Sequence, residues 1–357
     1  MNTVRLRSRR QTAFAAVAIT AGLTVMAAGC SSGSSGGSAS SSSSSGSKSS
    51  GTTSTTSVTL GNPAATYGEA AYVVADKQGY LAKNGISSKA VLLSSSSTLL
   101  AALVSGGVDF GTTNGAAVLA ARAKGVPVVA VCGLSQGVPG LALVVSPSTF
   151  KSLGLVSGDV SGDLKKLKGK KIGVNSPTAT GGKILAGLIQ DAGLSPTYLT
   201  ETTVSSSTMV AALAHGEIDG FFQDIPVPQQ AVNAGSGKIA FTTAQVPALK
   251  NIQYNVIATS ENFLKQHQDT VTKFLAGIKQ GEAALAAKNQ AAFNDIGSIY
   301  SGISPSVVQS AATTGLQTNC EMPKSAWSAL TTVSIKWGLV PKSTTSAQVA
   351  QAYKSGL

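Results

Sequence analysis

The sequence predicts an α/β protein of two lobes, each a β-sheet flanked by helices, and three observations support this fold class. A fifteen-residue phrase occurs twice, at 95–109 and 205–219, with nine identical positions. Short apolar segments alternate with segments of helical period along most of the chain. About 300 residues remain after an unusual N-terminal region, a length typical of two domains.

Residues 1–29 have the pattern of an export signal, because four arginines precede an uncharged apolar stretch that ends on small residues. The stretch closes on MAAGC, which resembles the lipobox of bacterial lipoproteins, although Ala27 stands where leucine is usual. We therefore expect Cys30 to be lipidated, and the protein to be exported and lipid-anchored to the outer face of the cell membrane. Simple secretion is the alternative.

Residues 30–57 consist of Cys30 and then almost only Ser, Gly and Thr, which cannot bury apolar surface and are expected to form a flexible tether. Beyond the tether we expect the first part of lobe one at 58–146 and lobe two at 147–258. A helical return to lobe one is expected at 259–357.

The charge pattern excludes a nucleic-acid partner. The formal charge of +12 falls to +8 when the four arginines of the signal are removed. The lysines of KKLKGKK at 165–171 lack the interleaved aromatic residues that bases require, so a solvated lysine face is the ordinary interpretation.

Each copy of the repeated phrase is predicted to be a strand, polar loop, helix, strand module. Its Ser-Ser-Ser-Thr opening supplies oxygens that cap a helix, and Gly106 and Gly216 end the two helices. Loops at the carboxyl ends of strands bind ligands in open α/β sheets, so two modules predict two sheets that face each other across a cleft. The alternative is two similar turns of one larger sheet.

The other elements follow the same alternation. Strands are expected at 57–62, 126–133, 141–146, 170–175, 238–243 and 254–260. Helices are expected between them, among them Asn114–Lys124, which Gly125 ends, and Thr180–Ala192, which Gly193 ends. After about residue 260 the pattern is helical throughout.

Four motifs in this order resemble the solute-binding proteins of ABC importers, above all the nitrate/sulfonate/taurine-binding group. They are YGEAAYVVADKQGYLAKNGI at 67–86, LxALxxGxxDFG at 100–111, LKKLKGKKIGVNSPTATGGKIL at 164–185 and LAHGEIDGF at 213–221. The resemblance implies the two-lobed type II periplasmic-binding-protein fold (Venus flytrap), whose chain crosses twice between lobes. We place the crossings near Val145–Ser148 and Ala258–Ser260.

The resemblance also implies a function, the capture of a small solute and its delivery to ABC permease subunits in the membrane. It implies a monomer without a cofactor. Two alternatives share the fold: an exported enzyme that acts through Ser135, and a tethered ligand sensor.

Catalysis and metal binding have little support in the residues. GLSQG at 133–137 matches G-x-S-x-G, but a nucleophile elbow must lead into a helix, and Val138-Pro139-Gly140 follows instead. The two histidines, His215 and His267, do not resemble general bases, and with three cysteines they show no metal-ligand spacing. We assign no catalytic or metal-binding residue. Cys132 and Cys320 are expected to form a disulfide in an exported protein, or else remain two buried thiols.

Candidate ligand-binding residues occupy the predicted loops at strand ends. In lobe one they are Tyr67, Ser95, Ser96, Thr112, Thr113, Asn114, Ser135 and Gln136, and in lobe two Ser176, Thr178, Thr180, Ser205, Ser206, Gln223 and Asp224. Each has a structural alternative, because such residues cap helices without any ligand. Lys183 could face an anion or water, and Asp109 and Asp219 are expected to hold loops.

The ligand's charge is open at this point. The single arginine after the signal, Arg122, ends a helix far from the predicted cleft, so an arginine clamp for a carboxylate is excluded. Helix N-termini and hydroxyls can hold a sulfonate or nitrate-type oxyanion, which we favour. Asp224 opposes an anion and would suit an amine-bearing heterocycle such as a pyrimidine, the second choice.

Overall fold

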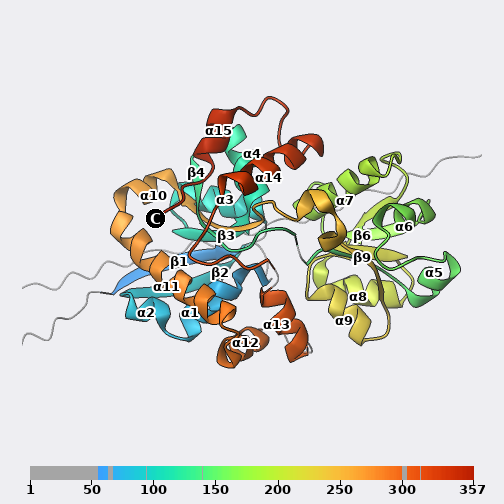
Figure 1. The fold of residues 1–357 in the computed structure, drawn as a ribbon, viewed down its shortest axis with the longest axis horizontal. Coiled ribbons are helices and arrows are strands. Elements are labelled where there is room, and N and C mark those ends of the chain that lie inside the picture. The colour runs from blue at the N-terminus through green and yellow to red at the C-terminus, as the bar shows by residue number, and fades with distance from the viewer. Residues whose placement is uncertain (1–54, 63–66, 94, 139, 300–303, 314) are drawn as a thin grey trace, which may run out of the picture. The chain divides into compact units, whose positions relative to one another are not determined.

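Two five-stranded sheets organise the part of the chain that the structure, a computed structural model, describes (Figure 1). That part comprises residues 55–62, 67–93, 95–138, 140–299, 304–313 and 315–357. The expected export signal, Cys30 and nearly all of the tether lie outside it, as does the side chain of Tyr67. The described residues belong to one compact unit, Thr52–Leu357.

The first sheet has the strand order β2-β1-β3-β10-β4. Its strands are β1 Thr56–Asn62, β2 Ile86–Leu92, β3 Phe110–Asn114, β4 Val128–Gly133 and β10 Asn255–Ser260. Strands β1, β2 and β3 are parallel, whereas β10 runs antiparallel to both β3 and β4. Successive residues of β4 enter the apolar clusters on opposite faces, Ala130 on one face and Val131 on the other, as the alternation of a strand buried on both faces requires.

The second sheet repeats this arrangement in the order β7-β6-β8-β5-β9. Its strands are β5 Ala142–Val145, β6 Lys171–Val174, β7 Thr200–Thr203, β8 Gly220–Gln223 and β9 Lys238–Thr242. Here β5 is the antiparallel strand, between β8 and β9. Each position of the first sheet therefore has a counterpart in the second, and the predicted α/β fold with two sheets is confirmed.

The repeated phrase occupies the same place in both sheets. It forms helix α3, Ser96–Ser105, before β3 and helix α8, Ser206–Ala214, before β8. The repeated aspartates also match. A carboxylate oxygen of Asp109 accepts the Thr59 N–H of β1 at 2.7 Å, and one of Asp219 accepts the Lys171 N–H of β6 at 2.9 Å. Both aspartates thus fix the loop before a strand to the adjacent parallel strand.

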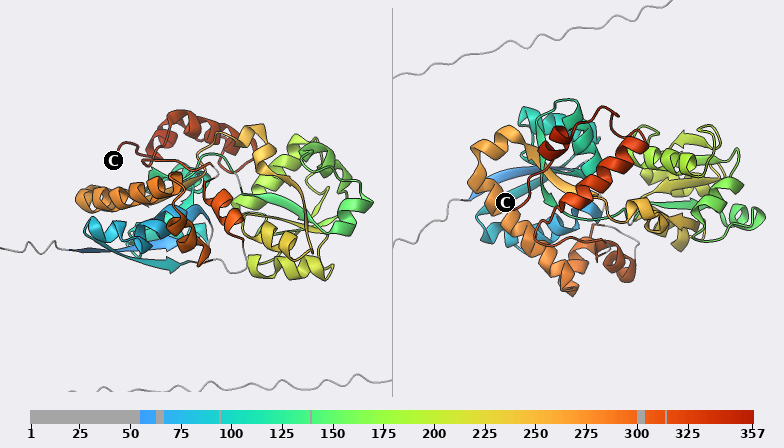
Figure 2. Two further views of the ribbon diagram at one scale, coloured as in Figure 1. Left: turned by 60° about the horizontal axis from the view of Figure 1, so that its bottom comes forward. Right: turned by 45° about the horizontal axis from the view of Figure 1, so that its top comes forward.

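The helices cover both faces of the sheets (Figure 2). The first half of the chain contributes α1 Ala70–Lys77, α2 Tyr80–Lys83, α4 Gly115–Ala123, α5 Pro147–Ser152, α6 Val160–Lys166 and α7 Thr180–Asp191. The second half contributes α9 Val227–Asn233, α10 Glu261–Gln266, α11 Gln268–Ala286, α12 Gln290–Gly297, α13 Pro305–Thr313, α14 Lys324–Lys336 and α15 Ser346–Gln351. Short 3-10 helices are η1 Tyr67–Glu69, η2 Thr243–Gln245 and η3 Pro247–Leu249. Among the described helices, none has the length and apolar character needed to cross a membrane.

The predicted crossings between the lobes are wrong. Val145 ends β5, which already belongs to the second sheet, and Ala258 lies inside β10 of the first. The crossovers are instead residues 134–141 and 243–254, so the predicted lobe limit at 146 falls after β5 instead of before it, and the limit at 258 falls within β10. A short, fully buried strand carries no periodicity that tells which sheet it joins.

The two crossovers are hydrogen-bonded to each other. The Gly137 N–H donates to the Ile252 carbonyl at 2.8 Å, and the Tyr254 N–H donates to the Ser135 carbonyl at 3.0 Å. A third segment runs beside them, since the Gln317 N–H donates to the Leu134 carbonyl at 3.1 Å. The connection between the lobes is therefore a small ribbon of paired backbone.

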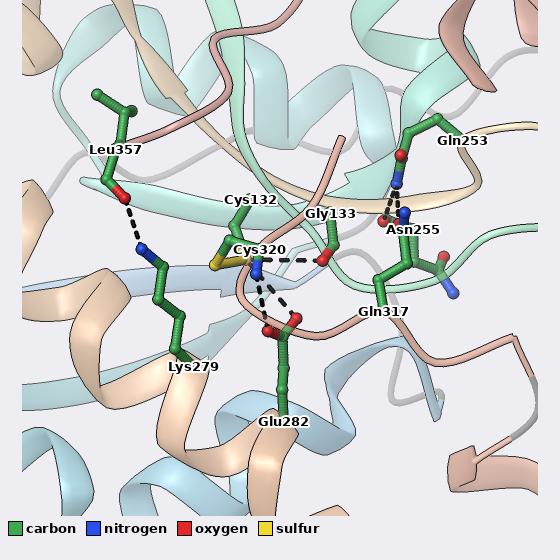
Figure 3. The surroundings of a disulfide bond; sticks show 9 residues. All are labelled: Cys132, Gly133, Gln253, Asn255, Lys279, Glu282, Gln317, Cys320 and Leu357. Carbon is green, nitrogen blue, oxygen red and sulfur yellow. Dashed lines mark hydrogen bonds between the residues drawn. A yellow bond between two sulfur atoms is a disulfide. The ribbon is translucent and has the colours of Figure 1, made fainter. Parts of the chain in front are cut away.

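A disulfide fixes the base of this ribbon, because Cys132 at the end of β4 is bonded to Cys320 (Figure 3). The bond closes a loop with a sequence separation of 188 residues, which on the chain-entropy scale stabilises the fold by up to about 5 kcal/mol. The fully buried carboxyl of Glu282 accepts the Cys320 N–H at 2.9 Å. Burial raises the pKa of Glu282 to about 8, although this hydrogen bond opposes the shift.

Glu282 should make the stability of the protein depend on pH. Its folded pKa lies above its ordinary value, so the folded protein keeps a proton that the unfolded chain releases, and stability falls as the pH rises from about 5 to 8. Glu282→Gln keeps an acceptor without a charge. At pH 8.5 we expect Glu282→Gln to melt at a higher temperature than the wild type. Its free energy of unfolding should be larger, by an amount on the order of a few kcal/mol.

The same comparison at pH 5 should show little difference between the two proteins. Glu321→Gln, which changes an exposed neighbour, is the control. Parallel pH profiles for wild type and Glu282→Gln would contradict the assignment.

Candidate functional site

A cavity of about 340 Å³ lies between the two sheets. Its lining comes from both lobes, and nine of the residues predicted from the sequence belong to it: Ser95, Ser96, Thr112, Thr113, Asn114, Ser176, Thr180, Gln223 and Asp224. The volume is at the lower end of the range for small-molecule sites, which is roughly 300–1,000 Å³. Strand ends and helix starts meet here because the carboxyl ends of the parallel strands in both sheets face the cavity.

The sequence missed a second group of lining residues. They are Gly68, Leu141, Asn175, Ala179, Gly181, Gly182, Phe222, Tyr254 and Asn255. Leu141, Tyr254 and Asn255 lie where β5 and β10 begin. Because these strands are antiparallel to their neighbours, their amino ends share the edge that the parallel strands reach with their carboxyl ends. Had the directions of β5 and β10 been known, these three residues could have been placed at the cavity from the sequence.

Several predicted residues lie outside this cavity. Thr178 lines a neighbouring groove together with Lys183, whose ammonium group donates to the Gly338 carbonyl at 3.0 Å. Ser205 is the N-cap of α8 and does not line the cavity. The Ser206 hydroxyl donates to Oδ1 of Asn175 at 3.0 Å, and Ser206 does not line the cavity either. Arg122 pairs with Glu261 at 3.0 Å, outside the cavity lining.

Ser135 and Gln136 belong to the first crossover. The Ser135 hydroxyl accepts the Asn255 N–H at 3.2 Å, and the Gln136 amide donates to the Asn251 carbonyl at 3.3 Å. Gln136 therefore joins the crossovers and does not line the cavity. The chain after Ser135 continues as extended crossover and not as a helix, so the geometry of a nucleophile elbow is absent here.

A smaller chamber of about 30 Å³, room for roughly one water-sized group, adjoins the cavity. Four residues line both spaces: Gly68, Asp224, Tyr254 and Asn255. Ser135 lines only the chamber, with apolar residues that include Ala311, Ala312 and Leu316. The four shared residues thus mark the inner end of the cavity.

Three helix N-termini open on the cavity, and they differ in capping. Ser95 caps α3 by accepting the Thr98 N–H at 3.1 Å, and Asn114 caps α4 by accepting the Ala117 N–H at 2.9 Å. The N-cap of α7 is Ala179, which has no side-chain cap. The first turn of α7, with Gly181 and Gly182, therefore presents backbone N–H groups that an acceptor group of a ligand can satisfy.

Asp224 is the acidic residue of the cavity lining. Burial raises the pKa of its carboxyl to about 6, although the Ile225 N–H, which donates to it at 2.9 Å, opposes the shift. Burial, together with the negative charge of Asp224, raises the pKa of Tyr254 well above its ordinary value. At neutral pH the cavity therefore contains a carboxylate beside a protonated phenol.

The lobes also touch beside the cavity, where the end of α14 meets α7 (Figure 2). Lys336 and Asp191 form an ion pair at 2.7 Å. The Trp337 side chain is 7% exposed and lies against Gly187, where an added Cβ would come within 2.3 Å of the indole. Inside the cleft, the Asn114 amide donates to the Thr180 hydroxyl at 3.1 Å. These contacts join the lobes independently of the crossovers.

Two pseudo-equivalent lobes around a polar cavity define the class of the periplasmic binding-protein fold. Solved structures of this class resemble the chain. The alkanesulfonate-binding protein SsuA of Xanthomonas axonopodis, bound to MOPS, has 19% identity and a TM-score of 0.65 over 84% of this chain and 98% of that one. The nitrate-binding protein NrtA of Synechocystis has the same identity and TM-score over 84% of this chain and 86% of that one.

Residues 68–292 match the model of the NMT1/THI5-like family, and since this is well over half of the chain, the protein belongs to that family. A curated relative is the 4-amino-5-hydroxymethyl-2-methylpyrimidine phosphate synthase of Schizosaccharomyces pombe. It is 27% identical over 230 residues, which cover 61% of this chain and 62% of the enzyme's length. The resemblance found in the sequence motifs is confirmed for the family and the fold.

The contact of Trp337 with α7 should hold the lobes in the observed arrangement. Trp337→Ala removes a buried aromatic side chain, a change that costs about 3–5 kcal/mol in a rigid core. We expect a lower melting temperature and, in small-angle scattering, a larger radius of gyration for the ligand-free protein. Trp337→Phe, which keeps a ring against Gly187, is the control. A lower melting temperature with an unchanged radius of gyration would show that Trp337 contributes packing and does not hold the lobes together.

Proposed function

We propose that this protein captures a small polar solute outside the cell and delivers it to an ABC import permease. The observation that carries the proposal is the cavity of about 340 Å³, which is lined from both lobes. The two lobes are joined by two crossovers, the segment beside them and the contacts of α14. Bending at these connections would let the cavity walls separate. Closure of such lobes around a ligand excludes water and creates a surface that a permease can recognise.

An oxyanion is the first candidate for the acceptor end of the solute. The uncapped N-terminus of α7 supplies backbone N–H groups to the cavity, and such groups bind sulfonate, nitrate or related oxyanions without an arginine. Alkanesulfonate and nitrate, named for two structural neighbours, are oxyanions of this kind.

An enzyme is the second candidate, favoured by the match to the fission-yeast pyrimidine phosphate synthase. The described lining of the cavity and the chamber contains no His, Cys or Lys, so catalysis there would depend on carboxyl and hydroxyl side chains such as Asp224, Tyr254 and Ser135. Measured turnover that Ser135→Ala abolishes would favour the enzyme. A tethered sensor would share the cavity, and neighbouring genes for a permease and an ATPase would favour import over sensing.

Gly181→Phe should block the cavity without unfolding the protein. A Cβ on Gly181 would contact only Leu141, at 3.8 Å, so a ring there can extend into the cavity. We expect a solute identified by mass spectrometry of the purified protein, or by a thermal-shift panel if it emerges empty, to bind the variant at least tenfold more weakly, about 1.4 kcal/mol.

Wild type should also contract in small-angle scattering when this solute saturates it. Gly107→Phe, at an exposed glycine of lobe one outside the cavity, is the control and should bind normally. Equal affinities of wild type and Gly181→Phe would place solute binding elsewhere.

Export and lipid anchoring are part of the proposal, supported by the arginine-rich apolar segment and MAAGC at the N-terminus. Cys30→Ala should release the protein from the membrane fraction and leave its melting temperature and solute affinity unchanged, because a segment of almost only Ser, Gly and Thr has few apolar side chains to bury. Membrane fractionation with immunodetection measures this. Retention of the variant in the membrane fraction would show that another feature anchors it.

A further inference from the structure

Lysine side chains gather at the end of the second lobe that faces away from the cavity. The carboxyl ends of the parallel strands in the second sheet face the cavity, so their amino ends, such as Lys238 of β9, lie at the opposite edge. Val145 at the end of the antiparallel strand β5 pairs with Lys238, so α5 begins at this same edge. Figure 1 shows α5 and α6 at this end of the second lobe.

Contacts join α5, α6 and β9 into one surface at this end. The Lys238 ammonium group lies over the Phe150 ring of α5, 4.2 Å from the ring centroid. The Lys166 ammonium group of α6 donates to the Gly154 carbonyl at 2.6 Å. The loop between α5 and α6, residues 153–159, therefore has a lysine from a different element on each side.

The outer part of this loop is apolar. The Val156 side chain is 58% exposed, and its backbone N–H donates to the buried carboxyl of Asp163 at 2.8 Å. The Gly158 N–H donates to the Ala240 carbonyl of β9 at 2.7 Å. An exposed apolar side chain is ordinary by itself. Here the two hydrogen bonds hold the loop in place, so the fold itself keeps Val156 in water among ammonium groups.

The charge around Val156 is strongly positive. Residues 150–168 and Lys238 together contain five lysines, all exposed, and two aspartates. Asp159 is exposed, whereas Asp163 is fully buried. We call the exposed lysines the basic end: Lys151, Lys165, Lys166, Lys168 and Lys238. The other half of the same edge, toward β7, carries both signs of charge and is not part of it: Lys170, Lys171, Glu201, Glu217 and Asp219.

An anionic bilayer fits this surface better than a dissolved polyanion does. Lysines close to a negatively charged membrane are attracted to its lipid head groups. An apolar side chain among them can enter the boundary between head groups and acyl chains, a contact that a dissolved polyanion does not offer. Nucleic acid is disfavoured, because the Phe150 ring lies under Lys238 and is not free to stack on a base.

The chain before the described residues points to the same partner. Strand β1 begins at Thr56, directly after the Ser/Gly/Thr tether that follows Cys30. A lipid on Cys30 would keep the protein within a root-mean-square distance of roughly 28 Å from the bilayer. At such a distance the effective concentration of lipid is high, so a contact that is weak in free solution becomes populated.

We propose that the basic end of the second lobe, with Val156 at its centre, rests on the anionic lipid head groups of the membrane. The contact is reversible, so it orients the anchored protein and does not replace the anchor. No residue of this surface lines the cavity, so the solute site stays free. The proposal adds an interaction surface to the proposed function and does not depend on the identity of the solute.

Vesicle flotation with the Cys30→Ala protein measures this contact directly, because the lipid anchor is then absent. The vesicles contain phosphatidylcholine alone, or phosphatidylcholine mixed with the anionic phosphatidylglycerol. We expect binding to the anionic vesicles only. The binding should be lost when the salt is raised from about 0.1 M to about 1 M, because the Debye length falls from about 10 Å to about 3 Å.

Two further changes in the Cys30→Ala protein remove the charges and the apolar side chain separately. The triple variant Lys151→Gln/Lys165→Gln/Lys168→Gln should bind the anionic vesicles at least tenfold more weakly. Val156→Ser should bind them roughly threefold more weakly, because it removes the apolar contact.

Matched controls remove the same groups from exposed positions of the first lobe and should leave vesicle binding unchanged. They are the triple variant Lys77→Gln/Lys89→Gln/Lys265→Gln and the single variant Val104→Ser. Circular dichroism verifies that every variant is folded.

The outcomes decide on this surface separately from solute capture. Absence of binding to anionic vesicles at low salt overturns the proposal. An equal loss in the control triple variant also overturns it, because net charge alone would then explain the binding. Binding that Val156→Ser leaves unchanged and that soluble polyphosphate abolishes overturns the choice of a bilayer in favour of a dissolved polyanion. In each case the solute affinity of the basic-end triple variant, which should equal that of the wild type, reports on solute capture.

Discussion

The pairing of the two crossovers is the constraint on which the functional part of the structure depends. Residues 134–141 and 243–254 run side by side with backbone hydrogen bonds between them, and each leads into the antiparallel strand of the opposite sheet. This exchange places the starts of β5 and β10 at the edge where the parallel strands end. Leu141, Tyr254 and Asn255 enter the cavity as a consequence, together with the loop that carries Asp224.

The ribbon is anchored more firmly on the side of the first lobe. The disulfide ties Cys320, three residues after the segment at 315–317, to Cys132 of β4, and the buried carboxyl of Glu282 accepts the Cys320 backbone N–H. The second lobe has no described disulfide and meets the C-terminal part through α7, Lys336 and Trp337. A change in the opening of the lobes would therefore alter the α7 contacts while the base of the ribbon stays rigid.

Much of the fold could be predicted because the same strand, loop, helix, strand module occurs twice in the chain. The phrases at 95–109 and 205–219 give one helix start, one glycine stop and one aspartate each, and the aspartates have the same role in both sheets. The helix starts differ from the prediction in one respect, because Ser95 caps α3 with its side chain whereas Ser205 makes no side-chain cap on α8. The lobe limits could not be predicted in this way. Strands β5 and β10 are short and buried on both faces, so their side chains carry no signal of direction or of the sheet they join.

The candidate site shows the same division. Hydroxyl and amide residues that follow parallel strands, such as Thr113 and Asn114, were found from their positions in the sequence. The sequence could not show which of them would be satisfied by neighbours. Asn114 caps α4 and bonds Thr180, whereas Thr113 next to it is left without a partner. That distinction depends on contacts between segments far apart in the chain.

Three polar features of the cavity wall are informative about its purpose. A carboxylate in a partly desolvated wall, a buried hydroxyl without a partner and an uncapped helix N-terminus are each unfavourable in a folded protein unless another group satisfies them. All three belong to the lining of one cavity. Since a polar ligand in the cavity would supply partners for these groups, its binding would stabilise the protein with the two lobes closed around it.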